Sequence, residues 1–371
     1  MLRTLLVPLD GSVLAERALP YASRLARAAG ARLLLMRATL AHPVEGIEEA
    51  DARAAMVERA EIELGSVAER LRHEGLIVEP AVYYAEAAEA ILKAARERQA
   101  DLIVMSTLGR TGLGRWIYGS VANRVLQRAE VPLVLVPASC ERAWAAEGPR
   151  RILVPLDGSP LAEEALAPAQ ALAELGHADL LLARVVEPLA PIEPHGGYLP
   201  PLHPDESELD AARQYLESVA SPLRFGGRTV TVHVVQGSPA AQISAVARER
   251  QVDLIAMATH GRGGVARLVM GSVAAEVLRQ ASGPLLVVRP SAVREAIGVP
   301  EIAQGQTAGP ALSVRLTERE LALVQQALEA RLADAEREAG ARVRASAGAR
   351  ELSDLLAELQ QAEATTTRGR A

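Results

Sequence analysis

Along residues 1–140, short apolar runs alternate with longer amphipathic stretches. All but the third run are continuously apolar, and the five runs lie at 2–9, 31–39, 76–84, 101–107 and 131–137. Continuous apolar runs are typical of strands buried on both faces of a parallel sheet, and the amphipathic stretches between them indicate helical crossovers. The pattern therefore predicts an α/β fold with a doubly wound parallel sheet.

Local signals mark where the first helix begins and ends. Ser12 is a candidate N-cap, and Gly30 supplies a C-terminal stop. Pro20 lies inside the apolar periodicity, so we expect it to kink or shorten the helix. Further helices are predicted at 46–73, 87–98 and 119–129.

The chain contains this unit twice. VPLDGSVLAERAL at 7–19 returns as VPLDGSPLAEEAL at 154–166 with two of thirteen positions changed, and the segment beginning at Arg96 returns at Arg248. Two matched blocks in the same order indicate a tandem duplication of about one domain length. The strands of the second copy are expected at 151–156, 179–186, 229–236, 253–259 and 284–290.

The duplication predicts one domain at 1–140 and a second at 150–290. Residues 291–312 read as a linker, and 313–363 as a helical tail that forms a hairpin. Short isolated amphipathic helices are marginal in water. The tail is therefore expected to pack on the α/β body, to join a homo-oligomer or to bind a protein partner.

Composition excludes several classes of protein. The net charge is −6 and aromatic residues make up 2%, which disfavours nucleic acid as a partner. No apolar run reaches membrane length, so we expect a cytoplasmic chain without a membrane partner. Cys140 is the single cysteine, which leaves no disulfide framework and no multi-cysteine metal site. Because Lys93 is the only lysine and lies outside any glycine-rich loop, a Walker-type phosphate loop is absent.

Candidate chemistry falls at the carboxyl ends of the strands, where ligands bind in open α/β sheets. An aspartate follows the first strand of each copy, at Asp10 and Asp157, and a glycine-bearing loop follows the fourth, at 109–120 and 261–272. Glycines let a backbone approach an anion, and N–H groups and a hydroxyl at a helix start can hold a phosphate. The same residues also occur simply as turns and helix caps.

These motifs resemble the universal stress protein family. VPLDGS, the M-x-T-x-G-R segment and the G-x9-G-S loop carry the resemblance over about 1–140 and 150–290. It implies two tandem five-stranded sheets of order 3-2-1-4-5, the adenine nucleotide alpha hydrolase-like fold, and a G-x2-G-x9-G-[ST] loop for ATP phosphates. The nucleotide-binding positions that it carries over are Asp10, Ala38, Gly109, Gly119 and Ser120, and Asp157, Val185, Gly261, Gly271 and Ser272.

The loops depart from the family pattern at its first glycine, which is Ser106 in one copy and Ala258 in the other. Arg110 and Arg262 could neutralise phosphate. His260, where the first copy has a leucine, could donate to it, so we expect the second copy to bind more tightly. Family members also dimerise through the fifth strand, which predicts that the two copies pack against each other.

The expected function is ATP binding, with or without Mg²⁺, in a stress-response or signalling role. One alternative is an interaction scaffold whose nucleotide sites are vestigial. Another is a slow ATPase, which ranks last because no general base or catalytic lysine lies beside the loop. No catalytic or metal-binding residue is assigned.

Overall fold

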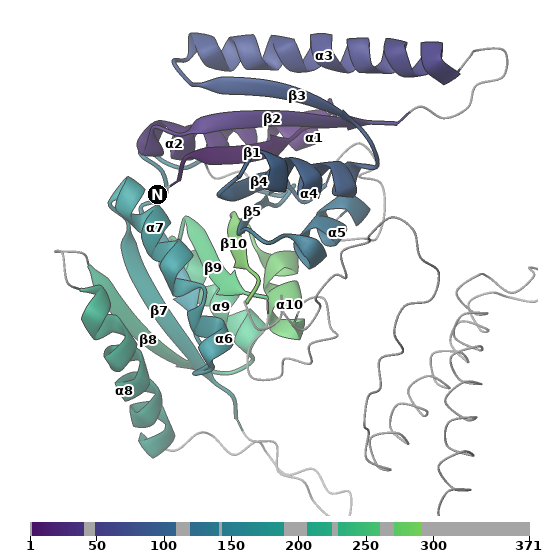
Figure 1. The fold of residues 1–371 in the computed structure, drawn as a ribbon. Coiled ribbons are helices and arrows are strands. Elements are labelled where there is room, and N and C mark those ends of the chain that lie inside the picture. Colours follow the sequence, from purple (N-terminus) through teal and green to yellow (C-terminus); the bar gives the residue numbers. More distant parts are fainter. Residues whose placement is uncertain are drawn as a thin grey trace, which may run out of the picture. The chain divides into compact units, whose positions relative to one another are not determined.

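The computed structural model describes residues 2–40, 49–108, 119–140, 143–188, 206–224, 229–259 and 271–290. They belong to one compact unit, residues 1–299 (Figure 1). The strands of the first copy are β1 (Thr4–Pro8), β2 (Arg32–Thr39), β3 (Val78–Tyr84), β4 (Leu102–Ser106) and β5 (Leu133–Val136). Its helices are α1 (Val13–Glu16), α2 (Leu19–Ala29), α3 (Glu49–His73), α4 (Ala87–Glu97) and α5 (Ser120–Arg128).

The second copy repeats this element order. Its strands are β6 (Arg151–Pro155), β7 (Asp179–Val186), β8 (Val230–Gln236), β9 (Leu254–Ala258) and β10 (Leu285–Val288). Its helices are α6 (Pro160–Glu163), α7 (Leu166–Gly176), α8 (Glu206–Leu223), α9 (Pro239–Glu249) and α10 (Ser272–Gln280). The predicted strands are therefore confirmed, each within two residues of its expected start and end.

The expected break in the first helix is also present. Ser12 accepts a hydrogen bond from the backbone N–H of Ala15 and caps α1, which ends at Glu16. The chain then restarts as α2, with Pro20 in its first turn, where a missing N–H costs nothing. Gly30 ends α2 with φ +62°, a left-handed conformation that favours glycine.

The ten strands form one continuous sheet. Its order is β3-β2-β1-β4-β5-β10-β9-β6-β7-β8, so each half has the predicted order 3-2-1-4-5. All pairs within a half are parallel. The order reverses between β1 and β4 in one half and between β6 and β9 in the other.

The halves join through their fifth strands. β5 and β10 pair antiparallel, with Leu285 opposite Leu135 and Val287 opposite Leu133. This confirms that the copies pack against each other. Each fifth strand would otherwise present an apolar edge, and their pairing removes both edges.

Helices cover both faces of the sheet. Neighbouring residues on a strand point to opposite faces, and on β1 Leu5 packs in one core while Leu6 packs in the other. The first core contains residues of α2, α3, α7 and α8, and the second those of α4, α5, α9 and α10. Both cores include residues of both copies, so each runs across the joint.

The segment between the copies contributes a buried anchor that the sequence did not indicate. Trp144 is 3% exposed, and its Nε1 donates to the carbonyl of Asp253 at 2.9 Å. Its ring meets that of Tyr21 edge-on, with centroids 4.9 Å apart. Tyr21 Oη in turn lies 3.0 Å from Cys140 Sγ. Trp144 thus touches α2 of the first copy and the start of β9 in the second.

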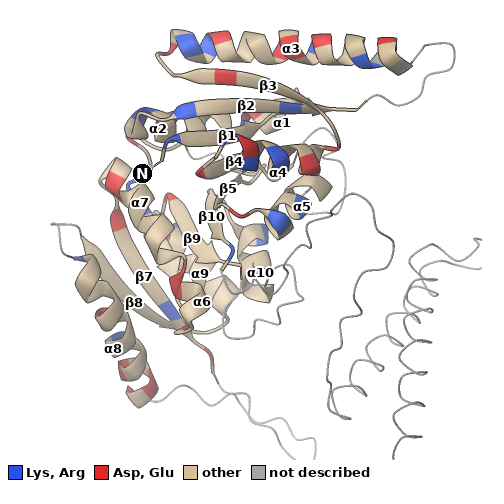
Figure 2. Cartoon of the chain, viewed as in Figure 1, with Lys and Arg blue, Asp and Glu red and all other residues tan. Residues whose placement is uncertain are grey.

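The long outer helix α3 buries one face in the core and carries charged residues on its exposed face. Acidic and basic side chains are interspersed along it (Figure 2), and Arg59 pairs with Glu63 one turn away at 2.8 Å. Within the described residues, no helix is long and apolar enough to cross a membrane. The predicted linker at 291–312 and tail at 313–363 lie outside the described residues.

Candidate functional site

The candidate site lies where β1 and β4 end side by side. Their register pairs Leu6 with Ile103, so the same spacing continued along both strands places Asp10 opposite Thr107. In the second copy Leu153 pairs with Ile255, which places Asp157 opposite Thr259. The switch point of each half therefore brings together the aspartate and the beginning of the glycine-bearing loop.

Each aspartate organises the turn that leaves the sheet. Asp10 Oδ1 accepts from Ser12 N at 2.9 Å and from Ser12 Oγ at 2.6 Å. Asp157 Oδ1 accepts the same two bonds from Ser159 at the same distances. The intervening Gly11 and Gly158 have φ +81° and +84°, which favours glycine. These aspartates therefore have a structural role whether or not a ligand is present.

The last glycine of each loop begins a helix. Gly119 N donates to the carbonyl of Thr107, and Gly271 N to that of Thr259, both at 2.7 Å. These bonds attach the starts of α5 and α10 to the ends of β4 and β9. Gly119 and Gly271 are the N-caps, and Ser120 and Ser272 are the exposed first residues of the helices. Neither serine is therefore the cap, and both are exposed in the first turn of a helix.

The fold itself does not require glycine at the first of these caps. Gly119 has φ −63°, which any residue adopts. Among the described residues, a Cβ placed there would meet only the Thr107 carbonyl oxygen, at 3.6 Å, an ordinary van der Waals distance. The absent side chain leaves open the space above the helix N-terminus, where an anion would approach.

Ala38 and Val185 present backbone rather than side chain to the site. Met36 O accepts from Leu9 N, the residue after β1. Because peptide groups alternate along a strand, those of Ala38 face the same side, beyond the end of β1. In the second copy Ala183 O accepts from Leu156 N, so Val185 has the equivalent position. The family resemblance includes both among the nucleotide-binding positions.

Five predicted site residues lie outside the described residues: Gly109, Arg110, His260, Gly261 and Arg262. Their roles remain predictions. In the described part of the chain, no group of three or more His, Cys, Asp or Glu side chains could hold a metal ion.

The sequence analysis missed the arginine beside each aspartate turn. Arg37 lies against Gly11, where a Cβ would come 3.0 Å from its guanidinium, and it forms an ion pair with Glu63. Hydrogen bonds from Arg59 and Arg37 lower the pKa of Glu63 to about 2. The aligned block around each first strand places Arg184 at the corresponding position of the second copy.

Arg184 has different surroundings. Its guanidinium lies 5.1 Å from the centre of the Tyr215 ring, and Tyr215 Oη donates to Glu163 at 2.8 Å. Burial, followed by the Glu163 hydrogen bond, raises the pKa of Tyr215. The only sequence signal for these arginines was a charged residue in an otherwise apolar strand.

Comparison with known families identifies this architecture. The sequence model of the Universal stress protein family matches residues 1–137 and 148–289. The chain belongs to the universal stress protein family. The two matched segments coincide with the halves of the sheet, so this universal stress protein carries two tandem family domains.

Individual relatives agree with the assignment. A universal stress protein of Mycolicibacterium smegmatis is 29% identical over 219 residues, or 58% of this chain and 70% of the relative. One from Thermus aquaticus is 37% identical over 137 residues, which is 37% of this chain and 99% of that protein. The chain spans 63% of the matched Mycobacterium tuberculosis relative Rv2005c. The crystal structure of a universal stress protein from Archaeoglobus fulgidus has 22% identity and TM-score 0.58, and covers 77% of this chain and 98% of its own, which shows the shared fold.

Proposed function

We propose that this universal stress protein binds an adenine nucleotide, ATP in the first instance, at the carboxyl edge of each half. The N-cap glycine carries the proposal. Gly119 has a conformation open to any residue and room for a Cβ, yet it stands before an exposed serine at a helix N-terminus. A side chain is thus missing where a phosphate would sit, although the described residues around Gly119 leave room for one.

The surrounding groups suit the parts of a nucleotide. N–H groups at the starts of α5 and α10, together with Ser120 and Ser272, would hold phosphate oxygens. The backbone of Ala38 and Val185 would face the base, and Asp10 and Asp157 the ribose. Arg110, Arg262 and His260 would neutralise phosphate charge, and Mg²⁺ would enter with the phosphates rather than on a preformed protein site.

The function would be nucleotide-responsive signalling in a stress response rather than catalysis. Lys93 lies on α4, where it is exposed and pairs with Glu97 at 3.7 Å. It is therefore occupied away from the switch point, and the chain has no other lysine. We assign no general base at the edge, and no lysine lies there, so in this proposal a bound nucleotide is held rather than turned over.

Isothermal titration of the full chain with ATP, ADP and AMP tests the proposal. We expect two ATP sites per chain, the tighter one in the second copy. Gly119→Val and Gly271→Val should each remove one site, because the new side chain occupies the anion position. Gly65→Ala is the matched control, since Gly65 lies in α3 with nothing within 4 Å of a Cβ.

Three results would count against the proposal. Unchanged stoichiometry in the doubly substituted chain, folded by circular dichroism, would refute the site. Absence of binding by the unsubstituted chain would favour a scaffold with vestigial sites. Steady phosphate release that the same substitutions abolish would instead make the chain an ATPase.

A further inference from the structure

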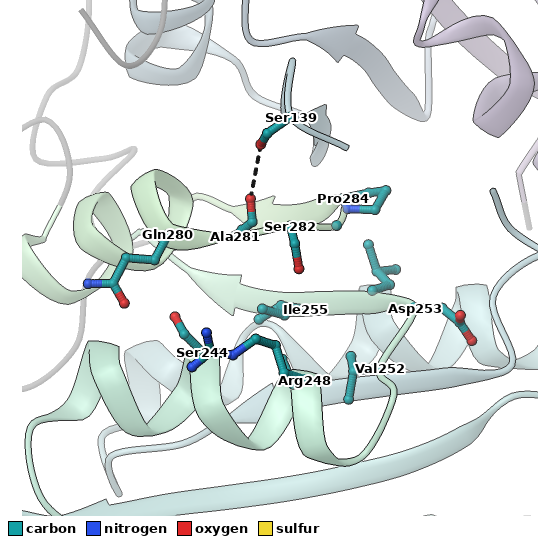
Figure 3. A pocket seen from close by; sticks show the side chains of 13 residues that line it. Ser139, Ser244, Arg248, Val252, Asp253, Ile255, Gln280, Ala281, Ser282 and Pro284 are labelled. Atoms are coloured by element: carbon teal, nitrogen blue, oxygen red, sulfur yellow. Dashed lines mark hydrogen bonds between the residues drawn. The ribbon is translucent and has the colours of Figure 1, made fainter. Parts of the chain in front are cut away.

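A cavity lies at the amino-terminal edge of the sheet, opposite the edge of the proposed nucleotide site. It has a volume of about 320 Å³ and lies where β9 and β10 begin, between α9 and α10 (Figure 3). This volume is at the lower end of the range for small-molecule sites. Because the nucleotide loops leave the carboxyl ends of the same strands, this cavity is separate from the proposed nucleotide site.

A buried hydroxyl in the cavity has no partner. Ser244 on α9 is 9% exposed, and its Oγ makes no hydrogen bond to any of the described residues. A buried polar group without a partner costs about 1–3 kcal/mol, so such groups are rare and call for an explanation. Ser244 lines the cavity, and a rotation of its side chain toward a bound ligand would supply the missing bond.

A positive charge lies beside this hydroxyl. Arg248 follows Ser244 by one helical turn on the same face of α9 and lines the same cavity. Figure 3 shows the Arg248 guanidinium directed back toward Ser244, with the Gln280 side chain at the same end of the cavity. An arginine, a hydroxyl and an amide together form a donor set that suits a carboxylate.

The rest of the cavity is mainly apolar. Val252, Ile255 and Pro284 line it. Asp253 lies at the end away from Ser244 in Figure 3, and its Oδ2 already accepts from the backbone N–H groups of Arg150 and Arg151 at 2.9 and 3.0 Å. A ligand would therefore place an anionic head at Ser244 and Arg248 and a short hydrocarbon tail toward Ile255.

The first copy provides an internal contrast. Its corresponding cavity, of about 270 Å³, is lined by Leu92 and Arg96 where the second copy has Ser244 and Arg248. Glu130 replaces Ser282 there. The first copy thus lacks the hydroxyl and has an acidic residue, both of which disfavour a carboxylate. It also has Arg128 where the second copy has Gln280, so the contrast between the copies rests on the hydroxyl and on Glu130 rather than on arginine.

From these observations we propose that the second copy binds a small organic carboxylate with a short apolar tail in the Ser244–Arg248 cavity. Ser139, in the segment between the copies, also lines this cavity, and its Oγ donates to the carbonyl of Ala281 at 3.5 Å. A bound carboxylate would therefore lie next to the segment that joins the two copies.

Saturation-transfer NMR on the full chain, with butyrate as the probe and no nucleotide present, tests the proposal. A ligand of this size is expected to bind with a Kd of about 1 mM. Arg248→Gln and Ser244→Leu, which writes the residue of the first copy into the second, should each weaken binding by about tenfold or more. Arg96→Gln, the matched change in the first copy, should leave binding unaltered.

The neutral analogue butyramide separates charge recognition from simple cavity filling, and we expect it not to bind. Equal binding of butyrate and butyramide would overturn the carboxylate assignment. So would binding that survives both changes in the second copy or that Arg96→Gln abolishes. Failure of the unsubstituted chain to bind butyrate would also overturn it. ATP titration of Ser244→Leu, expected to be unchanged, keeps this result independent of the nucleotide proposal.

Discussion

At the carboxyl edge, Asp10 and Asp157 accept the same bonds at the same distances, and Gly119 and Gly271 are attached to β4 and β9 by bonds of 2.7 Å. The helices behind this edge differ between the copies. Glu16 on α1 pairs with Arg70 at 2.8 Å, whereas its counterpart Glu163 accepts from Tyr215. The turn thus has the same geometry in both copies, although the contacts of the following helix differ between them.

This difference shows which positions the fold determines. The turn at the end of β1 or β6 has little conformational freedom. Its backbone must continue from a strand fixed in the sheet and also lead directly into the following helix. An exposed helix face can exchange an ion pair for a tyrosine hydrogen bond at little cost, since each contributes about 1 kcal/mol or less. The copies therefore agree at the edge and diverge on the helices and in the Ser244 cavity.

The largest effect is expected at Trp144, which has no counterpart because it belongs to the segment between the copies. Trp144→Ala should lower the free energy of unfolding by about 3–5 kcal/mol, the usual cost of deleting a buried aromatic side chain. Guanidinium denaturation measures it. Trp144→Phe keeps a ring against Tyr21 but loses the bond to Asp253, and should cost less. A loss below about 1 kcal/mol for Trp144→Ala would show that the segment does not anchor the copies.

The next effect compares two aspartates at the amino edge. Asp101 Oδ2 accepts from Arg3 N and Thr4 N, and Asp253 Oδ2 from Arg150 N and Arg151 N. Asp253 is buried and Asp101 half-buried. If the aspartate is removed, water can therefore bond to the freed backbone N–H groups more easily at Asp101 than at Asp253. We expect Asp253→Ala to cost about 2–3 kcal/mol and Asp101→Ala about half as much. Equal losses of unfolding free energy in urea denaturation would mean that burial does not distinguish the two aspartates.

Much of this architecture follows from sequence. The continuous apolar runs predicted β1, β2, β4 and β5, because a strand that helices cover on both faces has apolar residues at nearly every position. The repeat then predicted the second half, and the family resemblance predicted that the copies pack through their fifth strands. The strand order that the family resemblance implies places Asp10 and the loop that leads to Gly119 at one edge, because parallel strands end at the same edge.

The remaining features depend on contacts between distant segments. Trp144 lies in a short connection without periodicity, so its burial against Tyr21 and Asp253 left no local pattern. Arg37 meets Glu63 only after β2 and α3 pack together. Ser244 is one hydroxyl on α9, and its lack of a partner among the described residues depends on how the neighbouring elements pack around it.

A smaller and equal effect is expected at the two N-caps. Ser12 Oγ accepts from Ala15 N at 3.1 Å and Ser159 Oγ from Ala162 N at 3.2 Å. Ser12→Ala and Ser159→Ala should each cost about 1 kcal/mol, because each exposes one helix N–H and loses a bond to its aspartate. Thermal unfolding of the two variants should shift by similar amounts. A shift in one copy alone would show that the matched turns differ in energy despite their matched geometry.

The smallest effect is a pH dependence confined to the first copy. Hydrogen bonds from Arg59 and Arg37 lower the pKa of Glu63 from 4.5 to about 2 in the folded chain. A depressed folded pKa means that the stabilisation is complete above pH 4.5 and is lost as the pH falls toward 2. Because Glu63 is 38% exposed, solvent screening limits the contribution to below about 1 kcal/mol.

NMR titration of the Glu63 carboxyl measures this pKa directly. Arg59→Met should raise it most and Arg37→Met less, in the order of the two hydrogen bonds. Arg184→Met is the matched control, since Arg184 packs on Tyr215 rather than on a carboxylate, and it should leave the Glu63 pKa unchanged. If Arg37→Met has no effect, Arg37 does not hold Glu63, and the turn at Gly11 is supported by packing against the Arg37 side chain alone.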